Sequence, residues 1–377
     1  MSTAPIVIIG AGLAGSAAAW RIAETGRDVV VLERDEPAGH WGSSHGSARI
    51  FRYAYPDPFY AALVADARRG WDELEAAART TLITPTGALD FGAQRDPQAL
   101  ARVLAGIDVP HDLFTAEAAA SRWPGLAFDG PVLWHESAGV IDAESAVRAM
   151  LRLAVAAGAR VEQQWVAASV ERRGGGYVVV AEDGREQLAS QVVVAAGGWI
   201  PDLLGALGLS DGARRAFPSV EVRQEQALHF PYRDPDAAWP TFIHKSDALQ
   251  TYGLPGGRDA EFRGQKVAIY NGGRVIASAR DHERVIDETQ RDRLVDYVTR
   301  TLPGLVPEPY AGTTCLFTNL PGDEFVLDRV EGVTLLSPCS GHGAKFAPLI
   351  GELAARLVAG DQDVPTRFRP LSQRVDA

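Results

Sequence analysis

Three glycines near the start of the chain are spaced so that the backbone around them could approach a ligand closely. Gly10, Gly12 and Gly15 follow the apolar run 6–9 and lead into an alanine-rich stretch. In such a turn the first glycine permits a tight bend, the second admits a phosphate, and the third lets a helix pack on the strand. The free N–H groups that begin the helix favour an anion. This pattern predicts a site for a dinucleotide pyrophosphate.

The segments that follow suit this interpretation. A helix is expected over residues 13–25, with Gly26 just past its end, and a second strand over residues 28–32 ends at Glu33. Glu33 lies close to the roughly 20-residue offset at which a carboxylate accepts hydrogen bonds from a ribose. The alternative is a strand–helix–strand unit whose glycines serve packing alone.

A second group of reactive side chains lies in residues 42–52. His45, Arg49 and Arg52 stand there among small residues, which let the backbone lie against a flat ligand. Arg49 and Arg52 are three apart, so on a helical turn they would share a face. The alternative is a solvated basic loop.

Lys345 stands near the start of a helix expected over residues 346–358, after a glycine-rich loop. A cation there opposes the helix dipole by roughly 0.3–1 kcal/mol. Its position suggests a neighbouring anion, such as a substrate carboxylate. The alternative is an exposed lysine that solvent screens.

The two cysteines, Cys315 and Cys339, do not make a disulfide framework. Because unpaired cysteine is often buried, residue type alone predicts that both are buried free thiols.

These groups need a scaffold, and the chain predicts an α/β fold with two domains. A helix over residues 140–157, capped by Asp142, is followed by strand-like segments that lead to Gly197-Gly198-Trp199, and a late strand is expected over residues 333–337. Two other stretches mix short alternating strands with turns. We expect a Rossmann-like domain with an inserted α+β substrate domain on a mixed, largely antiparallel sheet. The predicted ranges are 1–81, 135–217 and 313–377 for the first domain, and 82–134 and 218–312 for the second.

Composition narrows the classes of partner. The chain has 377 residues, 46% hydrophobic and 23% charged, with a net charge of −11. Such a balance is ordinary for a globular protein and makes a nucleic-acid partner unexpected. The uncharged run 5–20 lacks a preceding basic region, and no run reaches the ~20 apolar residues of a membrane helix. We therefore expect a cytoplasmic protein with neither a membrane nor a nucleic-acid partner.

Several segments, taken in order, resemble the monomeric sarcosine oxidase family of flavoproteins, which includes N-methyltryptophan oxidase and related amine oxidases. The stretches 94–119 and 227–250 carry little of this resemblance. The matching positions are the Gly10, Gly12 and Gly15 turn, residues 42–46 with Arg49 and Arg52, residues 84–92, residues 122–125, Gly198-Trp199, Lys266, Cys315 and residues 340–346.

The resemblance implies roles toward an FAD cofactor. Cys315 would carry FAD covalently through a thioether, and His45 and Arg49 would lie against the flavin. Lys266 would activate oxygen, because a cation there stabilises the negative charge that develops as the first electron moves. The further cofactor-binding positions implied are Gly10, Gly12, Leu13, Gly15, Glu33, Arg34, Ser43, Ser44, Val166, Gly197, Trp199, Gly341, Gly343 and Lys345. No metal site is expected.

The resemblance also implies a substrate site. Arg52 and Lys345 would pair with a carboxylate, Arg52 through its planar fork. Tyr252, Tyr270 and Phe317 would line the same site, and Tyr270 would join His45, Arg49 and Lys266 in catalysis. Two positions depart from the family members that oxidise sarcosine, which carry His in place of Tyr270 and Tyr in place of Phe317. The shape of the substrate is therefore open, although the carboxylate anchors remain.

We expect a monomeric, FAD-dependent oxidase of a secondary amino acid, N-methyl or cyclic, that releases an imine and H₂O₂ with O₂ as acceptor. One alternative is a flavin oxidase of a cyclic or aromatic amine in a biosynthetic pathway. Two others are an NAD-dependent dehydrogenase and a non-catalytic subunit that keeps the fold. A flavin spectrum and a peroxide assay would discriminate among them.

Overall fold

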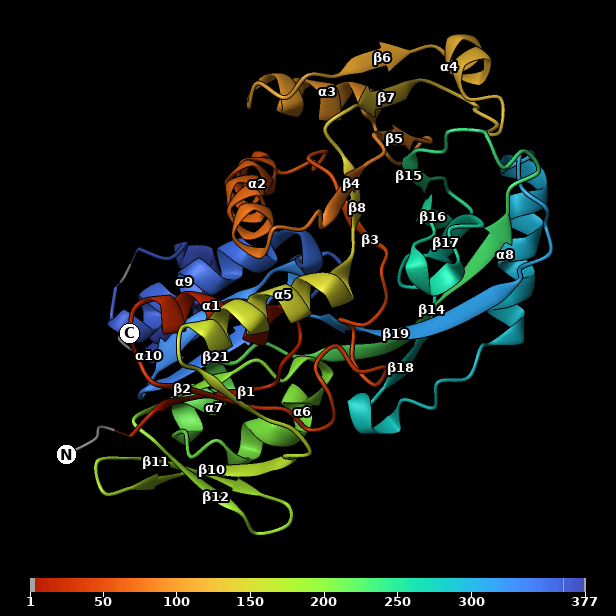
Figure 1. Cartoon of the computed structure of the whole chain (residues 1–377). Helices are drawn as coiled ribbons and strands as arrows, with labels where there is room; N and C mark the ends of the chain where they lie inside the picture. The colour runs from red at the N-terminus through yellow and green to blue at the C-terminus, as the bar shows by residue number, and fades with distance from the viewer. Residues whose placement is uncertain (1–3, 362, 376–377) are drawn as a thin grey trace.

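A parallel sheet forms the first half of the molecule (Figure 1). The computed structural model describes residues 4–361 and 363–375. The sheet has the strand order β20-β21-β13-β1-β2-β9, and its pairs are parallel except for β20 with β21. Its strands are β1 (Ile6–Ile9), β2 (Val29–Leu32), β9 (Arg160–Glu162), β13 (Gln191–Val194), β20 (Val326–Val330) and β21 (Val333–Ser337). The central strands are continuous apolar runs because both faces of the sheet are covered.

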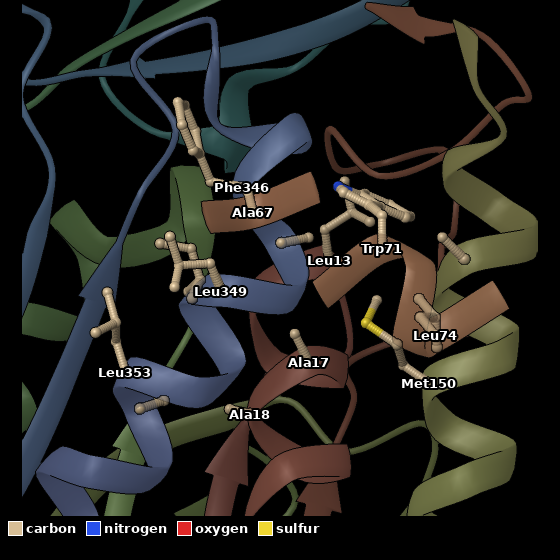
Figure 2. Close-up of a cluster of buried hydrophobic side chains, with 14 of the residues drawn as sticks. Leu13, Ala17, Ala18, Ala67, Trp71, Leu74, Met150, Phe346, Leu349 and Leu353 are labelled. Carbon is tan, nitrogen blue, oxygen red and sulfur yellow. The ribbon is translucent and has the colours of Figure 1, made fainter. Parts of the chain in front are cut away.

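Helices cover one face of this sheet. Figure 2 shows Leu13 and Ala17 of α1 packed among Trp71, Met150 and Phe346, which come from the neighbouring segments. The small residues of α1 let its neighbours approach closely, and the resulting core is fully buried. The four helices are α1 (Leu13–Glu24), α2 (Pro58–Ala78), α5 (Ala143–Ala156) and α9 (Ala347–Ala359).

The other face packs on a separate three-stranded sheet and short helices. Val7 and Ile9 point to this side, whereas Ile6 and Ile8 point to the helices, as strand alternation requires. The elements are β10 (Ala167–Arg173), β11 (Gly176–Ala181), β12 (Glu186–Ala189), α6 (Ile200–Leu203), α7 (Asp211–Ala216) and α10 (Pro370–Val375).

A larger, nine-stranded sheet forms the second half, with the order β18-β14-β17-β16-β15-β5-β7-β6 and with β19 also paired to β14. The pair β15–β5 is parallel, and the other strand pairs in the described part of this sheet are antiparallel. Its strands are β5 (Ala88–Phe91), β6 (Asp112–Phe114), β7 (Val132–His135), β14 (Glu221–Pro231), β15 (Thr241–Lys245), β16 (Gln250–Pro255), β17 (Gly264–Ile269), β18 (Arg274–Ile276) and β19 (Ala311–Asn319). Helices α3 (Pro97–Ala105), α4 (Ala116–Arg122) and α8 (Glu288–Thr301) accompany it. In Figure 1, α3, α4 and β6 lie at the opposite end of the molecule from β10, β11 and β12.

The predicted domain boundaries remain a prediction. Strand β19 spans the expected boundary at residue 313 and pairs with β14 along its whole length, from Asn319 opposite Glu221 to Ala311 opposite His229. Residues 1–3, 362 and 376–377 of the predicted ranges lie outside the described residues.

Three local expectations need correction. The helix expected over 140–157 starts only at Ala143, because Val140 belongs to β8 (Gly139–Ile141), which pairs with β3 (Arg49–Phe51) and β4 (Ile83–Pro85). Asp142 does cap that helix, accepting a hydrogen bond from the Ser145 N–H at 2.9 Å. The last helix starts at Ala347 after a 3₁₀ turn, Gly343–Phe346. Arg49 lies on a strand, so Arg49 and Arg52 do not share a helical face.

In the described part of the chain, no helix is long and apolar enough to cross a membrane.

Candidate active site

One cavity of about 600 Å³ lies between the two large sheets and begins at the carboxyl ends of the parallel strands. Ligands of open α/β sheets bind at such an edge. The cavity is lined by residues from both sheets and from the loop after β2. Every predicted site residue lines it except Gly15, which lies behind the glycine turn.

The glycine turn is shaped by close backbone approaches. Gly10 has φ +101°, and a Cβ there would lie 2.6 Å from the Ala195 carbonyl oxygen. A Cβ on Gly15 would lie 1.9 Å from the Gly10 carbonyl oxygen. Both contacts are shorter than carbon and oxygen permit, so the turn needs glycine at both positions.

Two side chains brace this turn from other segments. The two oxygens of Glu33 accept hydrogen bonds from the Ala11 N–H at 2.7 Å and from the Asp35 N–H at 3.1 Å. Burial raises the pKa of Glu33, and these two donors oppose that rise. The Ser44 hydroxyl accepts from the Leu13 N–H at 2.9 Å. The carboxylate can still accept from a ribose hydroxyl, and the serine can still donate to a phosphate.

Arg49 is locked by the loop that precedes it. Its guanidinium donates to the carbonyl oxygens of Ser43, His45 and Ala48, each at 2.9 Å. The cation is thereby held in one orientation at the cavity wall. His45 is buried, and burial followed by the charge of Arg49 lowers its pKa to about 3, so its ring is neutral. The Nε2 atom of His45 has no hydrogen-bond partner among the described residues.

Lys266 and Cys315 lie beside Arg49. Lys266 is buried on β17 and donates to the Ala48 carbonyl oxygen at 3.4 Å. Burial, then the like charge of Arg49, lowers the pKa of Lys266 to about 8. Cys315 on β19 is half-buried rather than fully buried, and burial raises its thiol pKa while the charges of Arg49 and Lys266 oppose that rise.

Cys339 was expected to be a buried free thiol, and the first part of that prediction is wrong. Cys339 is half-buried and lines the cavity. Its Sγ accepts from the Thr318 N–H at 3.4 Å, which ties the loop after β21 to β19. Residue type could not reveal this position, because it depends on strands that are distant in the sequence.

A buried cation cluster closes the other end of the cavity. Lys345 is buried, not exposed, and its ammonium donates to the Tyr55 hydroxyl at 2.9 Å and to the His342 carbonyl oxygen at 2.6 Å. Burial and then the charge of Arg52 lower the pKa of Lys345 well below its usual value. The Arg52 guanidinium lies 4.7 Å over the Tyr55 ring and is anchored to the Ala54 carbonyl oxygen. Arg52 and Lys345 thus converge on one tyrosine.

The His342 ring completes this cluster. Its Nε2 faces the Asp323 carbonyl oxygen at 2.9 Å, and its Nδ1 faces the Tyr55 hydroxyl at 2.9 Å. Because a carbonyl only accepts, Nε2 carries the proton and Nδ1 accepts from Tyr55. Burial and then Lys345 lower the pKa of His342 to about 3, which agrees with a neutral ring.

Tyr270 and Phe317 form an aromatic wall, with ring centroids 5.8 Å apart. The Tyr270 hydroxyl donates to the Asp323 carboxylate at 3.3 Å. Burial and then Asp323 raise the pKa of Tyr270, so it stays a phenol. Tyr252 lines the wall on β16, and burial raises its pKa as well.

The remaining predicted cofactor residues lie at both ends of the cavity. The Arg34 guanidinium lies 4.6 Å over the Trp199 ring. Val166 and Gly197 line the cavity there, and a Cβ at Gly197, which has φ +52°, would meet nothing within 4 Å. At the other end, a Cβ on Gly341 would lie 2.8 Å from the Phe317 ring. A Cβ on Gly343 would lie 1.6 Å from the Pro338 carbonyl oxygen.

Among the cavity residues that the sequence did not predict, four carry the chemistry of its far end: Tyr55, Lys245, Asp323 and the His342 ring. The only signal for Tyr55 was its position three residues after Arg52. Nothing local marked Lys245 or Asp323, because each reaches the cavity through pairing of distant segments.

The family described as FAD dependent oxidoreductase matches residues 5–357. The chain belongs to the FAD-dependent oxidoreductase family. It is 30% identical over 367 residues to the monomeric sarcosine oxidase of Streptomyces avermitilis, covering 94% of this chain and 93% of that protein. It is 28% identical over 375 residues to the N-methyl-L-tryptophan oxidase of Yersinia pestis, covering 96% of each. The resemblance stated from the motifs is therefore confirmed.

Solved structures confirm the fold class. The open form of NikD, an unusual amino acid oxidase essential for nikkomycin biosynthesis, superposes with a TM-score of 0.86 at 23% identity over 98% of each chain. The L-proline dehydrogenase of P. horikoshii superposes with a TM-score of 0.83 at 19% identity, over 100% of this chain and 99% of that one. At these identities the likeness concerns the fold.

The cavity of this FAD-dependent oxidoreductase fits its cofactor on three observations. The glycine turn leaves the backbone open where a pyrophosphate binds, Glu33 keeps acceptor capacity for a ribose, and the buried His45 Nε2 lacks a partner that a bound ring system could supply. The residues that would hold FAD are therefore the turn with Glu33 and Ser44 at the nucleotide end, and His45 with Arg49 at the flavin end.

Proposed function

We propose that the enzyme oxidises the C–N bond of a secondary amino acid, N-methyl or cyclic, as a cytoplasmic monomer with FAD bound covalently at Cys315. The amine loses a hydride equivalent from carbon and a proton from nitrogen to become an imine, and O₂ takes up both electrons and two protons to become H₂O₂. When bound, FAD supplies the transfer of electrons from the amine to oxygen. The names of the sarcosine and N-methyltryptophan oxidase relatives support a secondary amine with a carboxylate.

The observation that carries this proposal is the Lys345–Tyr55–Arg52 cluster, in which Lys345 and Tyr55 are buried and Arg52 is half-buried. No carboxylate among the described residues lies within 4.0 Å of the Lys345 ammonium, although the side chain is buried. A buried ammonium without an anionic partner is costly, and the cost is removed when a ligand brings the anion. Arg52 offers a second, planar set of donors beside it. A substrate carboxylate satisfies both.

Other residues would divide the remaining tasks. Lys266 and Arg49 place two cations at the flavin end of the cavity, where Lys266 would stabilise negative charge that develops on oxygen. Tyr270 and Phe317 would pack against the body of the substrate. Tyr270 holds its hydroxyl proton, so its catalytic role would be to orient the substrate amine by hydrogen bonding, not to abstract a proton.

A second candidate function is oxidation of a cyclic or aromatic amine. It is favoured by the aromatic wall of Tyr270 and Phe317, at two positions where the family resemblance implies His and Tyr for oxidation of sarcosine. An NAD-dependent dehydrogenase is disfavoured, because its cofactor makes no use of a cysteine beside two cations in the cavity.

The test is peroxide release from secondary amino acids and from their methyl esters. Wild-type enzyme should oxidise the free acid with a kcat/KM at least 100-fold above that of the ester, because two charge-assisted contacts are lost together. Lys345→Met and Arg52→Gln should each lower kcat/KM for the acid and leave that for the ester nearly unchanged. A preference for esters or simple amines would reject the carboxylate site, and loss of all peroxide with every amine would reject the oxidase.

A further inference from the structure

Lysine is confined to the cavity in this chain. The 37 basic residues comprise 34 arginines and three lysines, Lys245, Lys266 and Lys345, and all three line the cavity. The ion pairs of the described residues use arginine or histidine as the cation, and no lysine has a carboxylate within 4.0 Å. Two of the three lysines already have proposed tasks, at the oxygen site and at the substrate carboxylate. The third, Lys245, has none.

Lys245 is the last residue of β15 and lies at the aromatic wall of the cavity. Its ammonium lies 5.4 Å from the centroid of the Tyr270 ring. The side chain is half-buried, and its Nζ donates no hydrogen bond to any described residue. Burial lowers the pKa of Lys245, and the next contributions come from the like charges of Arg95 and Arg52. This cation therefore lines the same cavity as Arg52 and Lys345.

The charges at this end of the cavity do not balance. Lys345 and Arg52 converge on Tyr55, and Lys245 stands over Tyr270, so three cations face one space. Arg95 is already paired with Asp90. The nearby carboxylate of Asp323 is exposed to solvent and accepts from Tyr270, and it is not within ion-pair distance of Lys245. A substrate with one carboxylate would satisfy the Tyr55 cluster and leave Lys245 unmatched.

We propose that Lys245 binds a second acid group of the substrate, which is therefore a dicarboxylic secondary amino acid with an acidic side chain or N-substituent. This inference rests on the proposed function for the first carboxylate and for the amine. The second acid would lie beside Tyr270 and Phe317, at the wall that departs from the sarcosine-oxidising relatives. Lysine suits this task because its compact ammonium reaches a carboxylate as a single point of charge at the end of a flexible stem.

The first measurement compares N-methyl-L-glutamate with N-methyl-L-glutamine, which differ only in the charge of the distal group. Wild-type kcat/KM should favour the acid by roughly 10- to 100-fold, the range expected for one charge-assisted contact. Lys245→Met should bring the ratio to within about threefold of one, and Lys245→Arg should keep most of the preference. Arg274→Gln is the matched control, because it removes one positive charge from β18 of the same sheet, outside the cavity lining. Arg274 is exposed and paired with Glu283 at 2.8 Å, so its ratio should equal that of wild type.

The second measurement does not depend on turnover. Glutarate and its monoamide, glutaramate, are titrated into the holoenzyme, and binding is followed by the flavin absorbance and by calorimetry. In wild type, glutarate should bind more tightly than glutaramate by roughly 10-fold or more. In Lys245→Met the two ligands should bind with equal affinity.

The outcomes separate this inference from the proposed function. Equal treatment of acid and amide by wild type, or a preference that survives Lys245→Met, overturns the role of Lys245 even when peroxide is released. If no amine is oxidised but Lys245 still selects glutarate over glutaramate, the second acid site stands and the proposed oxidase activity fails. Equal loss of acid and amide in Lys245→Met, with flavin content and thermal midpoint unchanged, would assign Lys245 to the first carboxylate and also overturn the inference.

Discussion

At the scale of single residues, burial sets the protonation of the groups that line the cavity. His45 and His342 are neutral because their pKa values fall to about 3, while Lys266 titrates near neutrality because its pKa falls to about 8. The cavity therefore keeps its histidines as uncharged hydrogen-bonding rings. Lys266 is a cavity group whose charge responds to changes of pH near 8.

Lys266 should control the reaction of the reduced enzyme with oxygen. Raising the pH through about 8 removes the proton from its ammonium, so the oxygen rate should fall on the alkaline side. Lys266→Met should lower that rate by roughly 100- to 1,000-fold at pH 7 and abolish this inflection. Stopped-flow measurement of each half-reaction checks the assignment. Lys266→Arg is the control that keeps the charge. If Lys266→Met slows anaerobic reduction by substrate as much as it slows the reaction with oxygen, this role of Lys266 is wrong.

Cys315 should hold FAD covalently. Its thiol is half-buried on the cavity wall, beside the cations Arg49 and Lys266, which favour the thiolate. Acid precipitation should leave the flavin absorbance in the pellet for wild type and for Cys339→Ser, and should release it to the supernatant for Cys315→Ser. Flavin in the wild-type supernatant would show that the linkage is absent, and release from Cys339→Ser would move the attachment to the other cysteine.

At the scale of elements, the turn from β1 to α1 brings backbone atoms so close together that no side chain fits between them. The carbonyl oxygen of Gly10 occupies the place where a Cβ on Gly15 would lie, at 1.9 Å. The helix N-terminus therefore approaches the strand end only when residue 15 lacks a side chain.

Gly15→Ala should push α1 from this turn and reduce the fraction of protein that retains FAD by more than half, with a lower thermal midpoint. Gly205→Ala is the matched control, because a Cβ there would meet nothing within 4 Å and the residue does not have a positive φ. Flavin content per protein and thermal unfolding measure both variants. Wild-type flavin retention in Gly15→Ala would mean that the turn can relax without loss of the site.

At the scale of the whole molecule, a buried ion pair joins the nine-stranded sheet to the segment that carries Arg52. Asp90 on β5 accepts from Arg95 at 2.6 Å, and Arg95 also donates to the Ala54 carbonyl oxygen at 2.9 Å. Both side chains are almost fully buried. Arg52 is anchored to the same Ala54 carbonyl, so this pair positions the cation that we propose for the substrate carboxylate as well as the two regions.

Asp90→Asn should leave the Arg95 charge uncompensated in the interior and lower the free energy of unfolding by about 3–5 kcal/mol. Glu73→Gln is the control, since its ion pair with Arg21 is exposed and worth about 1 kcal/mol or less. Urea unfolding followed by circular dichroism compares the two. A loss below about 1 kcal/mol in Asp90→Asn would show that the pair contributes little.

Local sequence determined the elements whose signals lie within a few residues. The glycine turn, the Asp142 cap and the stop at Gly26, which has φ +78°, could all be predicted because turn and cap chemistry depends on adjacent backbone groups. The resemblance carried by the ordered motifs extended this to the fold and the flavin family. The same resemblance also singled out Arg52 and Lys345 as candidates for one carboxylate.

Only the tertiary structure decided where the cations and thiols lie relative to one another. Lys345 meets Tyr55 across 290 positions of the chain, and Lys245 reaches the cavity because β15 pairs with β16 and β5. Short strands such as β3 and β8 carry too few residues for a periodic signal, so Val140 was assigned to a helix and the strand that carries Arg49 was not predicted. The pKa of Lys266 depends on burial, which arises only when distant segments pack together and exclude solvent. The position of Cys339 on the cavity wall likewise depends on the assembled sheets.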